Sequence, residues 1–170
     1  MASTYTSNIG IEKIGAGEQA GTWGTTTNSN FDIIDRAING VGAITLSGTT
    51  HTLTTSDGTL SDGQYKVLVL GGSPSGTNTI TITPNDQDKL YFVKNSSGQS
   101  ATFTQGSGSD VTIANGKGAI IYADGGGSTA AVTDLTDVFV VGQAIDGVTV
   151  GATTPAAITG TTITANDSIL

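Results

Sequence analysis

The stretch QYKVLVLGGSPSGTNTITITPNDQDKLYFVKN, residues 64–95, contains three short runs of strand-forming residues separated by turn-forming ones. Valine, isoleucine, leucine, threonine and tyrosine fill the runs, with glycine, proline, asparagine and aspartate between them. In the middle run Ile80 and Ile82 alternate with threonines, which predicts a strand with one face in a core. KVLVL and KLYFV, and AIIYA at 119–123, are apolar on both faces, so we expect central strands, or strands covered by a helix or a neighbouring subunit.

The same pattern extends over residues 41–133, where strand candidates recur at intervals of roughly ten residues. Such spacing is typical of an antiparallel sandwich or barrel. We therefore predict an all-β protein in which residues 41–133 form an antiparallel, jelly-roll-like β-sandwich. The nine candidates are GAITLSG (42–48), HTLTTSDG (51–58), QYKVLVLGG (64–72), TNTITITPND (77–86), DKLYFVKN (88–95), QSATFTQG (99–106), DVTIANG (110–116), KGAIIYADGGG (117–127) and STAAVTD (128–134).

The composition supports this class and argues against two kinds of partner. Only 12% of the residues are charged, and the six lysines and arginines are scattered. Nucleic-acid binding needs clustered cations, so we expect neither a nucleic-acid partner nor binding to an anionic membrane surface. We expect no membrane insertion either, because no apolar stretch is long enough to span a bilayer. The chain lacks cysteine and begins without a signal-peptide pattern, which predicts synthesis in a cytoplasm without general export.

One helix is expected before the β-region, over roughly residues 28–39. Phe31, Ile34 and Ile38 fall at i, i+3 and i+7, which places them on one narrow apolar stripe. A helix of about three turns is not stable alone. The stripe therefore needs a partner, either the β-domain or copies of itself around a symmetry axis.

The segments on either side of this body contain few core-forming residues. Residues 1–24 read as a glycine-rich arm that becomes ordered only by docking, and together with the helix they form an attachment region over residues 1–40. Trp23, the single tryptophan, is interpreted either as an anchor for a partner's pocket or as a cover for this protein's own β-domain. Residues 134–170 alternate small and β-branched residues, which predicts an extended β stalk.

The residues that carry chemistry do not form a catalytic pattern. His51 is the only histidine, no serine lies in a nucleophile-elbow context, and most carboxylates fall in turns. We expect no enzyme activity, no catalytic residues and no cofactor. Asn85, Asp86 and Asp88 in PNDQDK resemble a short calcium-binding loop, but a turn with an Asx hydrogen bond is the favoured interpretation.

Three segments together resemble the virion-proximal part of a bacteriophage tail fibre, of the type found in phages of marine bacteria. GEQAGTWGTTTNSNFDIIDRAINGV at 17–41 is similar to the arm and helix of such proteins, and the β-region resembles the domain that follows. AIDGVTVGATTPAAITGTTITA at 144–165 resembles a shaft repeat, although Ile158 and Thr159 replace a more usual glycine and aromatic.

This resemblance implies a homotrimeric structural protein of the virion tail that supports host adsorption. Its N-terminal region would attach to the tail, the baseplate or an adaptor protein, with Trp23, Phe31, Ile34 and Ile38 as partner-binding residues. Distal parts would contact host surface glycan. Two other interpretations remain open, a glycan-binding module on the virion surface and a head-decoration or neck protein. Only nine aromatic residues exist, and Phe92, Phe103 and Tyr122 fall in core-like strands, which argues against a glycan platform.

Overall fold

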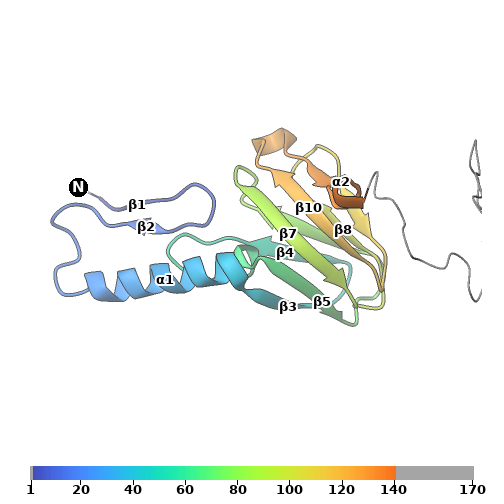
Figure 1. Ribbon diagram of the computed structural model, residues 1–170, viewed down its shortest axis with the longest axis horizontal. Helices are drawn as coiled ribbons and strands as arrows, with labels where there is room; N and C mark the ends of the chain where they lie inside the picture. Colours follow the sequence, from blue (N-terminus) through green and yellow to red (C-terminus); the bar gives the residue numbers. More distant parts are fainter. Residues whose placement is uncertain (1, 141–170) are drawn as a thin grey trace, which may run out of the picture. The chain divides into compact units, whose positions relative to one another are not determined.

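A computed structural model describes residues 2–140 of the chain, and the part up to Phe139 forms one compact unit (Figure 1). A short hairpin lies alongside a long helix, and nine further strands form two sheets. The helices and strands are β1 (Thr4–Tyr5), β2 (Glu12–Lys13), α1 (Trp23–Asn39), β3 (Val41–Leu46), β4 (Thr50–Thr54), β5 (Val67–Gly72), β6 (Asn78–Thr83), β7 (Asp88–Asn95), β8 (Ala101–Thr104), β9 (Val111–Ile113), β10 (Gly118–Asp124), β11 (Val132–Asp134) and α2 (Thr136–Val140).

Strands β3 to β8 wind as a flattened coil, because each strand belongs to the opposite sheet from the one before it. One sheet has five strands in the order β11-β10-β7-β5-β3, and the other has four in the order β4-β6-β8-β9. All nine predicted strands are present, and the three predicted central strands, β5, β7 and β10, are the interior strands of the five-stranded sheet. The mainly-β class is therefore confirmed.

The predicted antiparallel pairing is wrong for the coil. Strands β3, β5 and β7 pair in parallel, and so do β4, β6 and β8. Within the two larger sheets, the antiparallel pairs are β7 with β10, β10 with β11 and β8 with β9, so the jelly-roll topology is not confirmed. A hairpin and a connection that crosses to the opposite sheet both join strands of alternating residues through short turns. The sequence pattern therefore does not determine whether consecutive strands pair with each other.

The core lies between the two sheets. The alternation predicted for Ile80, Ile82 and Phe103 is confirmed, since each is at most 1% exposed while the threonines between them face outward. Burying one such large side chain stabilises a fold by about 1.5–3 kcal/mol. The core cluster comprises Ile44, Leu46, Leu53, Leu68, Leu70, Ile80, Ile82, Tyr91, Val93, Ala101, Phe103, Val111, Ile113, Ile121, Ala123 and Val132.

The outward-facing residues of the four-stranded sheet are threonines throughout. Parallel register aligns Thr50 with Thr79 and Thr79 with Thr102, and Thr102 pairs with Thr112 across the antiparallel step. The hydroxyls of Thr102 and Thr112 lie 2.9 Å apart and share a hydrogen bond. Threonine suits this position because its β-branched side chain favours a strand and its hydroxyl remains hydrated. The full set is Thr50, Thr52, Thr54, Thr79, Thr81, Thr83, Thr102, Thr104 and Thr112.

Backbone hydrogen bonds close one lateral side of the body, between the loop before β9 and the segment leading into β11. Ser107 N donates to Ser128 O (3.0 Å), and Val132 N donates to Ser109 O (2.7 Å). After β11, the Asp134 carboxylate accepts the Thr136 backbone N–H at 2.8 Å, and residues 136–140 form one helical turn. The stalk predicted over 134–170 is therefore not extended at 136–140, and its residues 141–170 lie outside the described part.

Helix α1 begins at Trp23, five residues before the predicted start, and ends at Asn39. Gly40 follows the helix at the position where a glycine commonly adopts a left-handed conformation, but its φ of −66° and ψ of 135° are extended. Glycine is required there for a different reason. A Cβ on Gly40 would lie 2.4 Å from the Arg36 carbonyl oxygen and 2.9 Å from the Tyr65 ring.

The joint between α1 and the β-body is built around the Tyr65 ring. The Arg36 guanidinium lies 4.3 Å from the ring centroid, and its Nη1 donates to the Ser61 carbonyl at 3.2 Å. Below the ring, Gly42 of β3 leaves a slot, since a Cβ there would lie 2.4 Å from a ring carbon. The backbone N–H groups of Lys66 and Val67 both donate to the Gly40 carbonyl. Helix and sheet are thus held in one fixed relation.

Replacing Gly42 with alanine should destabilise the protein, because the added methyl group displaces the Tyr65 ring. Overpacking of this kind costs about 1–3 kcal/mol of unfolding free energy. Gly71→Ala on the neighbouring strand β5 is the matched control, because a Cβ there meets no atom within 4 Å. Urea denaturation of both variants and the unchanged chain measures the difference. Equal losses for the two variants would contradict the packing described for Tyr65.

Candidate interaction surface

Helix α1 is covered on one side by the N-terminal arm. Ile33 is fully buried on this side. The Asn30 side chain pairs with the backbone of β2, accepting from Glu12 N at 2.9 Å and donating from Nδ2 to Glu12 O at 2.8 Å. The Asn30 side-chain amide thus makes the two hydrogen bonds to Glu12 that a neighbouring strand would make, and these bonds hold the arm along the helix.

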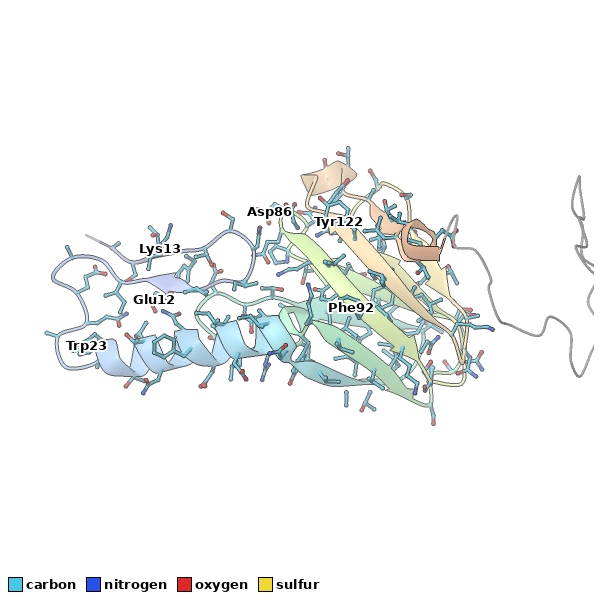
Figure 2. The ribbon with its side chains drawn as sticks, viewed as in Figure 1. Glu12, Lys13, Trp23, Asp86, Phe92 and Tyr122 are labelled. Carbon is cyan, nitrogen blue, oxygen red and sulfur yellow. The ribbon has the colours of Figure 1, made fainter. Side chains whose placement is uncertain are left out.

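An adjacent side of the same helix carries an apolar stripe that no part of the described chain covers. Trp23, Phe31 and Ile38 are each 61–62% exposed, and Ile34 beside them is partly buried. These four residues, with Thr27, follow one another at steps of three or four, which places them along one side of the helix. The structure therefore brings the four sequence-predicted partner-binding residues together on one surface, the α1 stripe. Figure 2 shows Trp23 at the end of α1 away from the sheets.

A second exposed apolar group lies on the outer face of the five-stranded sheet. Phe92 on β7 and Tyr122 on β10 are 41% and 37% exposed, and both lie on this sheet (Figure 2). The prediction that their strands are core-like is confirmed, but these two side chains point outward, whereas Phe103 is fully buried. Sequence reasoning missed them as surface residues. The signal was present, because runs such as KLYFV are apolar on both faces and one of the two faces is outside.

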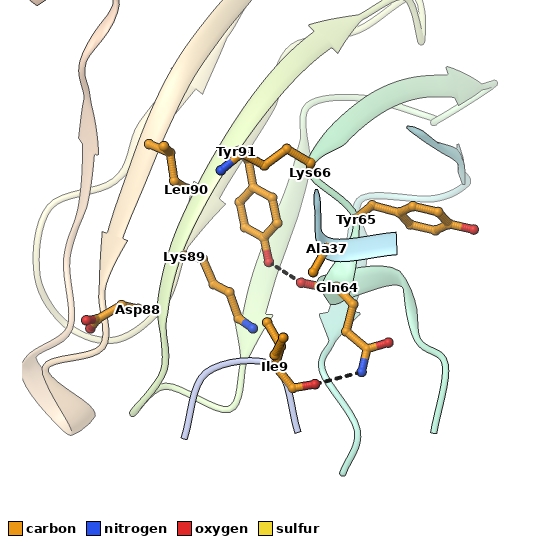
Figure 3. A pocket seen from close by; sticks show the side chains of 10 residues that line it. Ile9, Ala37, Gln64, Tyr65, Lys66, Asp88, Lys89, Leu90 and Tyr91 are labelled. Atoms are coloured by element: carbon orange, nitrogen blue, oxygen red, sulfur yellow. Dashed lines mark hydrogen bonds between the residues drawn. The ribbon is translucent and has the colours of Figure 1, made fainter. Parts of the chain in front are cut away.

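The arm docks on the β-body through residues 8–10. Gln64 Nε2 donates to the Ile9 carbonyl at 3.0 Å, and Gly58 N donates to the Gly10 carbonyl at 2.7 Å (Figure 3). Gly10 has a φ of +67°, and a Cβ there would lie 2.8 Å from the Ser56 carbonyl, so only glycine fits. The arm is thus docked on a surface that belongs to this chain.

Lys89 is a buried cation beneath the docked arm. It faces inward on β7, is 6% exposed, and its ammonium donates to the Asn8 carbonyl. Burial lowers the pKa of the Lys89 ammonium to about 8. Neighbouring Tyr91 donates its hydroxyl to the Gly63 carbonyl at 2.8 Å, and burial raises the pKa of that phenol. Both side chains line a cavity of about 110 Å³, which Lys66 and Asp88 also border (Figure 3).

The oxygen-rich residues considered for calcium separate in the structure. Asp86 lines a polar cavity of about 440 Å³ together with Asp57 and residues 5–7 of the arm. Asp88 borders a different cavity, the one beneath the docked arm, and its carboxylate packs closely against Gly125. Among the described residues, no three histidine, cysteine, aspartate or glutamate side chains are grouped to hold a metal ion. His51 is partly buried on β4.

Comparisons with known proteins add no relative. No family model, no curated protein and no solved structure matches the chain. Within residues 2–140, no helix has the length and apolar character needed to cross a membrane. The α1 stripe and the exposed residues of the five-stranded sheet are therefore the features from which function is inferred.

Replacing Lys89 with methionine should remove a pH-dependent cost to stability. The native pKa of about 8 lies below the ordinary 10.5, so the folded state binds fewer protons than the unfolded state between these values. Stability of the unchanged chain therefore rises as pH increases from about 8 to 10, and the full cost, on the order of 3 kcal/mol, applies below 8. Lys89→Met, which retains most of the volume, should be more stable than the unchanged chain at pH 7, with the difference shrinking by pH 10.

Urea denaturation across pH 7–10 measures this effect, and Lys94→Met on the exposed face of the same strand is the control. A difference between Lys89→Met and the unchanged chain that does not vary with pH would contradict the burial of a charged lysine.

Proposed function

We propose that this chain is a structural segment of a bacteriophage tail fibre, in which copies associate through Phe31, Ile34 and Ile38 of the α1 stripe. The observation that carries the proposal is the exposure of Phe31 and Ile38, each 61%, on a helix whose adjacent side is already covered. Large apolar side chains grouped on a surface mark an interaction site in a soluble protein. The attachment role and the virion location follow from the resemblance of residues 17–41, the β-region and residues 144–165 to such fibres.

The spacing of the stripe supports association of identical helices. Within α1, Thr27, Phe31, Ile34 and Ile38 are separated by steps of four, three and four residues. Alternating steps of three and four form the seam of a coiled coil, in which each helix presents the same positions to the others. Ile34 and Ile38 place one isoleucine at each of the two seam positions, and isoleucine at both positions favours three or four strands over two. Thr27 and Phe31 occupy the other two places of the seam. We therefore propose the homotrimer, with the three helices parallel around its axis.

Trp23 supports the attachment role. It lies at the end of α1 away from the sheets and is 62% exposed, so its ring is presented beyond the β-body (Figure 2). An exposed aromatic side chain at the tip of a rigid element is a suitable anchor for a pocket in another protein. We propose that this pocket belongs to the tail, the baseplate or an adaptor protein. No enzymatic step and no cofactor is part of this function.

Two substitutions on the stripe should dissociate the oligomer. The unchanged chain should have about three times its monomer mass of 16.9 kDa by light scattering, and Phe31→Ser with Ile38→Ser should have the monomer mass. Asn28→Ser with Asn39→Ser, two exposed residues away from the stripe on the same helix, is the control and should remain a trimer. Circular dichroism checks that each variant is folded. An unchanged chain that is monomeric at all concentrations would refute the proposed association.

Attachment can be tested separately from association. Trp23→Ser, introduced into the phage genome, should lower the amount of this protein in purified particles while the recombinant chain stays trimeric, because the anchor lies at the end of the helical seam. Thr25→Ser, an exposed change on the same turn, is the control. Quantitative mass spectrometry of particles measures incorporation. Equal incorporation of both variants would show that Trp23 is not part of the attachment site.

A further inference from the structure

The outer faces of the two sheets have opposite characters. The four-stranded sheet presents only threonines over its central region, and the hydroxyls of Thr102 and Thr112 hydrogen-bond to each other. The five-stranded sheet presents mainly valine, leucine, isoleucine, phenylalanine and tyrosine side chains, although Thr45, Lys94 and Thr133 also face outward. Its outward-facing apolar residues are Val41, Val67, Val69, Leu90, Phe92, Ile120 and Tyr122. A protein that exposed both faces equally to water would have no reason for this difference, so the five-stranded sheet is the side suited to being covered.

Strand register gathers these apolar residues into rows. Val41 pairs with Val67, Val67 with Phe92, and Phe92 with Ile120, which forms one row across four strands. Leu90 pairs with Tyr122 in the next row. Residues in register on one face lie close enough to contact each other, so the two rows form a continuous apolar patch. We call these six residues the sheet patch.

The sheet patch begins at Val41, three residues after Ile38 of the α1 stripe. Ile38 near the end of the helix is 61% exposed, and Val41 at the start of β3 is 60% exposed, with Gly40 between them holding the joint around Tyr65. Because that joint fixes the helix relative to the sheet, stripe and patch keep one relative position in every copy of the chain. A contact made through the stripe therefore brings the patch of each copy to an equivalent place.

We infer that the sheet patch packs against a second copy of this chain, as an extension of the contact through the α1 stripe. This inference rests on the proposed self-association and goes beyond it, because it places the β-body as well as the helix in the interface. The helix alone offers a short seam, and short helical contacts are weak. Adding a patch of six apolar residues per copy brings the interface nearer to the size of a stable assembly.

Thiol protection tests this inference, because the chain lacks cysteine and each variant then carries a single thiol. Phe92→Cys is placed in the patch, and Thr112→Cys on the exposed threonine face is the matched control. In the assembled chain, we expect a maleimide reagent to modify Phe92→Cys about tenfold more slowly than Thr112→Cys. In the Phe31→Ser, Ile38→Ser background the two thiols should react at similar rates. Tyr122→Cys replaces Phe92→Cys if the latter does not fold.

Each other outcome overturns the inference in a distinguishable way. If the chain is oligomeric but Phe92→Cys reacts as fast as Thr112→Cys, the sheet is not part of the interface. Association through the helix would then still stand. In that case, protection that appears only when host polysaccharide is added would instead identify the patch as a glycan platform. Slow reaction in both backgrounds would show that the thiol is shielded within its own chain. A monomeric parent chain would refute the proposed association together with the inference.

Discussion

The packing of Tyr65 between helix α1 and strand β3 is the contact on which the arrangement of the molecule depends. Its ring occupies the space left by the missing side chains of Gly40 and Gly42, with Arg36 against its face. Because both glycines are needed for close approach rather than for unusual dihedral angles, the joint tolerates no side chain on either. It converts a helix that would be free to pivot into a rigid extension of the five-stranded sheet, so apolar residues on the two elements act as one surface.

The sequence pattern predicted the strands well and their connections poorly. The alternation at Ile80, Ile82 and Phe103 depends only on burial, which is local to each strand, and it is confirmed. Parallel pairing depends on which strands become neighbours, and the turn residues alone do not encode that choice. The four predicted partner-binding residues lie on one helix face. Phe92 and Tyr122 were placed only in core-like strands, because a strand that is apolar on both faces does not show which of its side chains point inward.

The N-terminal arm shows why a segment with few apolar residues can still be ordered. Its contacts are mainly hydrogen bonds to backbone groups, from Asn30 to β2, from Gln64 to Ile9 and from Lys89 to Asn8. Such contacts were not predictable, since they pair side chains with backbone positions up to 81 residues away. Lys89 lies at the inner end of this contact, where a charged group is costly unless it is hydrogen-bonded. The hydrogen bond to the arm carbonyl offsets part of this cost, and it also ties the arm to the β-body.

The parallel coil carries a consequence for how such a body changes length in evolution. Val41, Val67 and Phe92 occupy the same place in successive turns, as do Thr50, Thr79 and Thr102 on the opposite sheet. A duplication or deletion of one whole turn would leave every remaining strand with a parallel neighbour in the same register. Neither the helix joint at the first turn nor the closure between residues 107–109 and 128–132 would need to be rebuilt. Homologues of different length are therefore expected to differ by complete turns, with insertions of partial turns excluded by the register of the core.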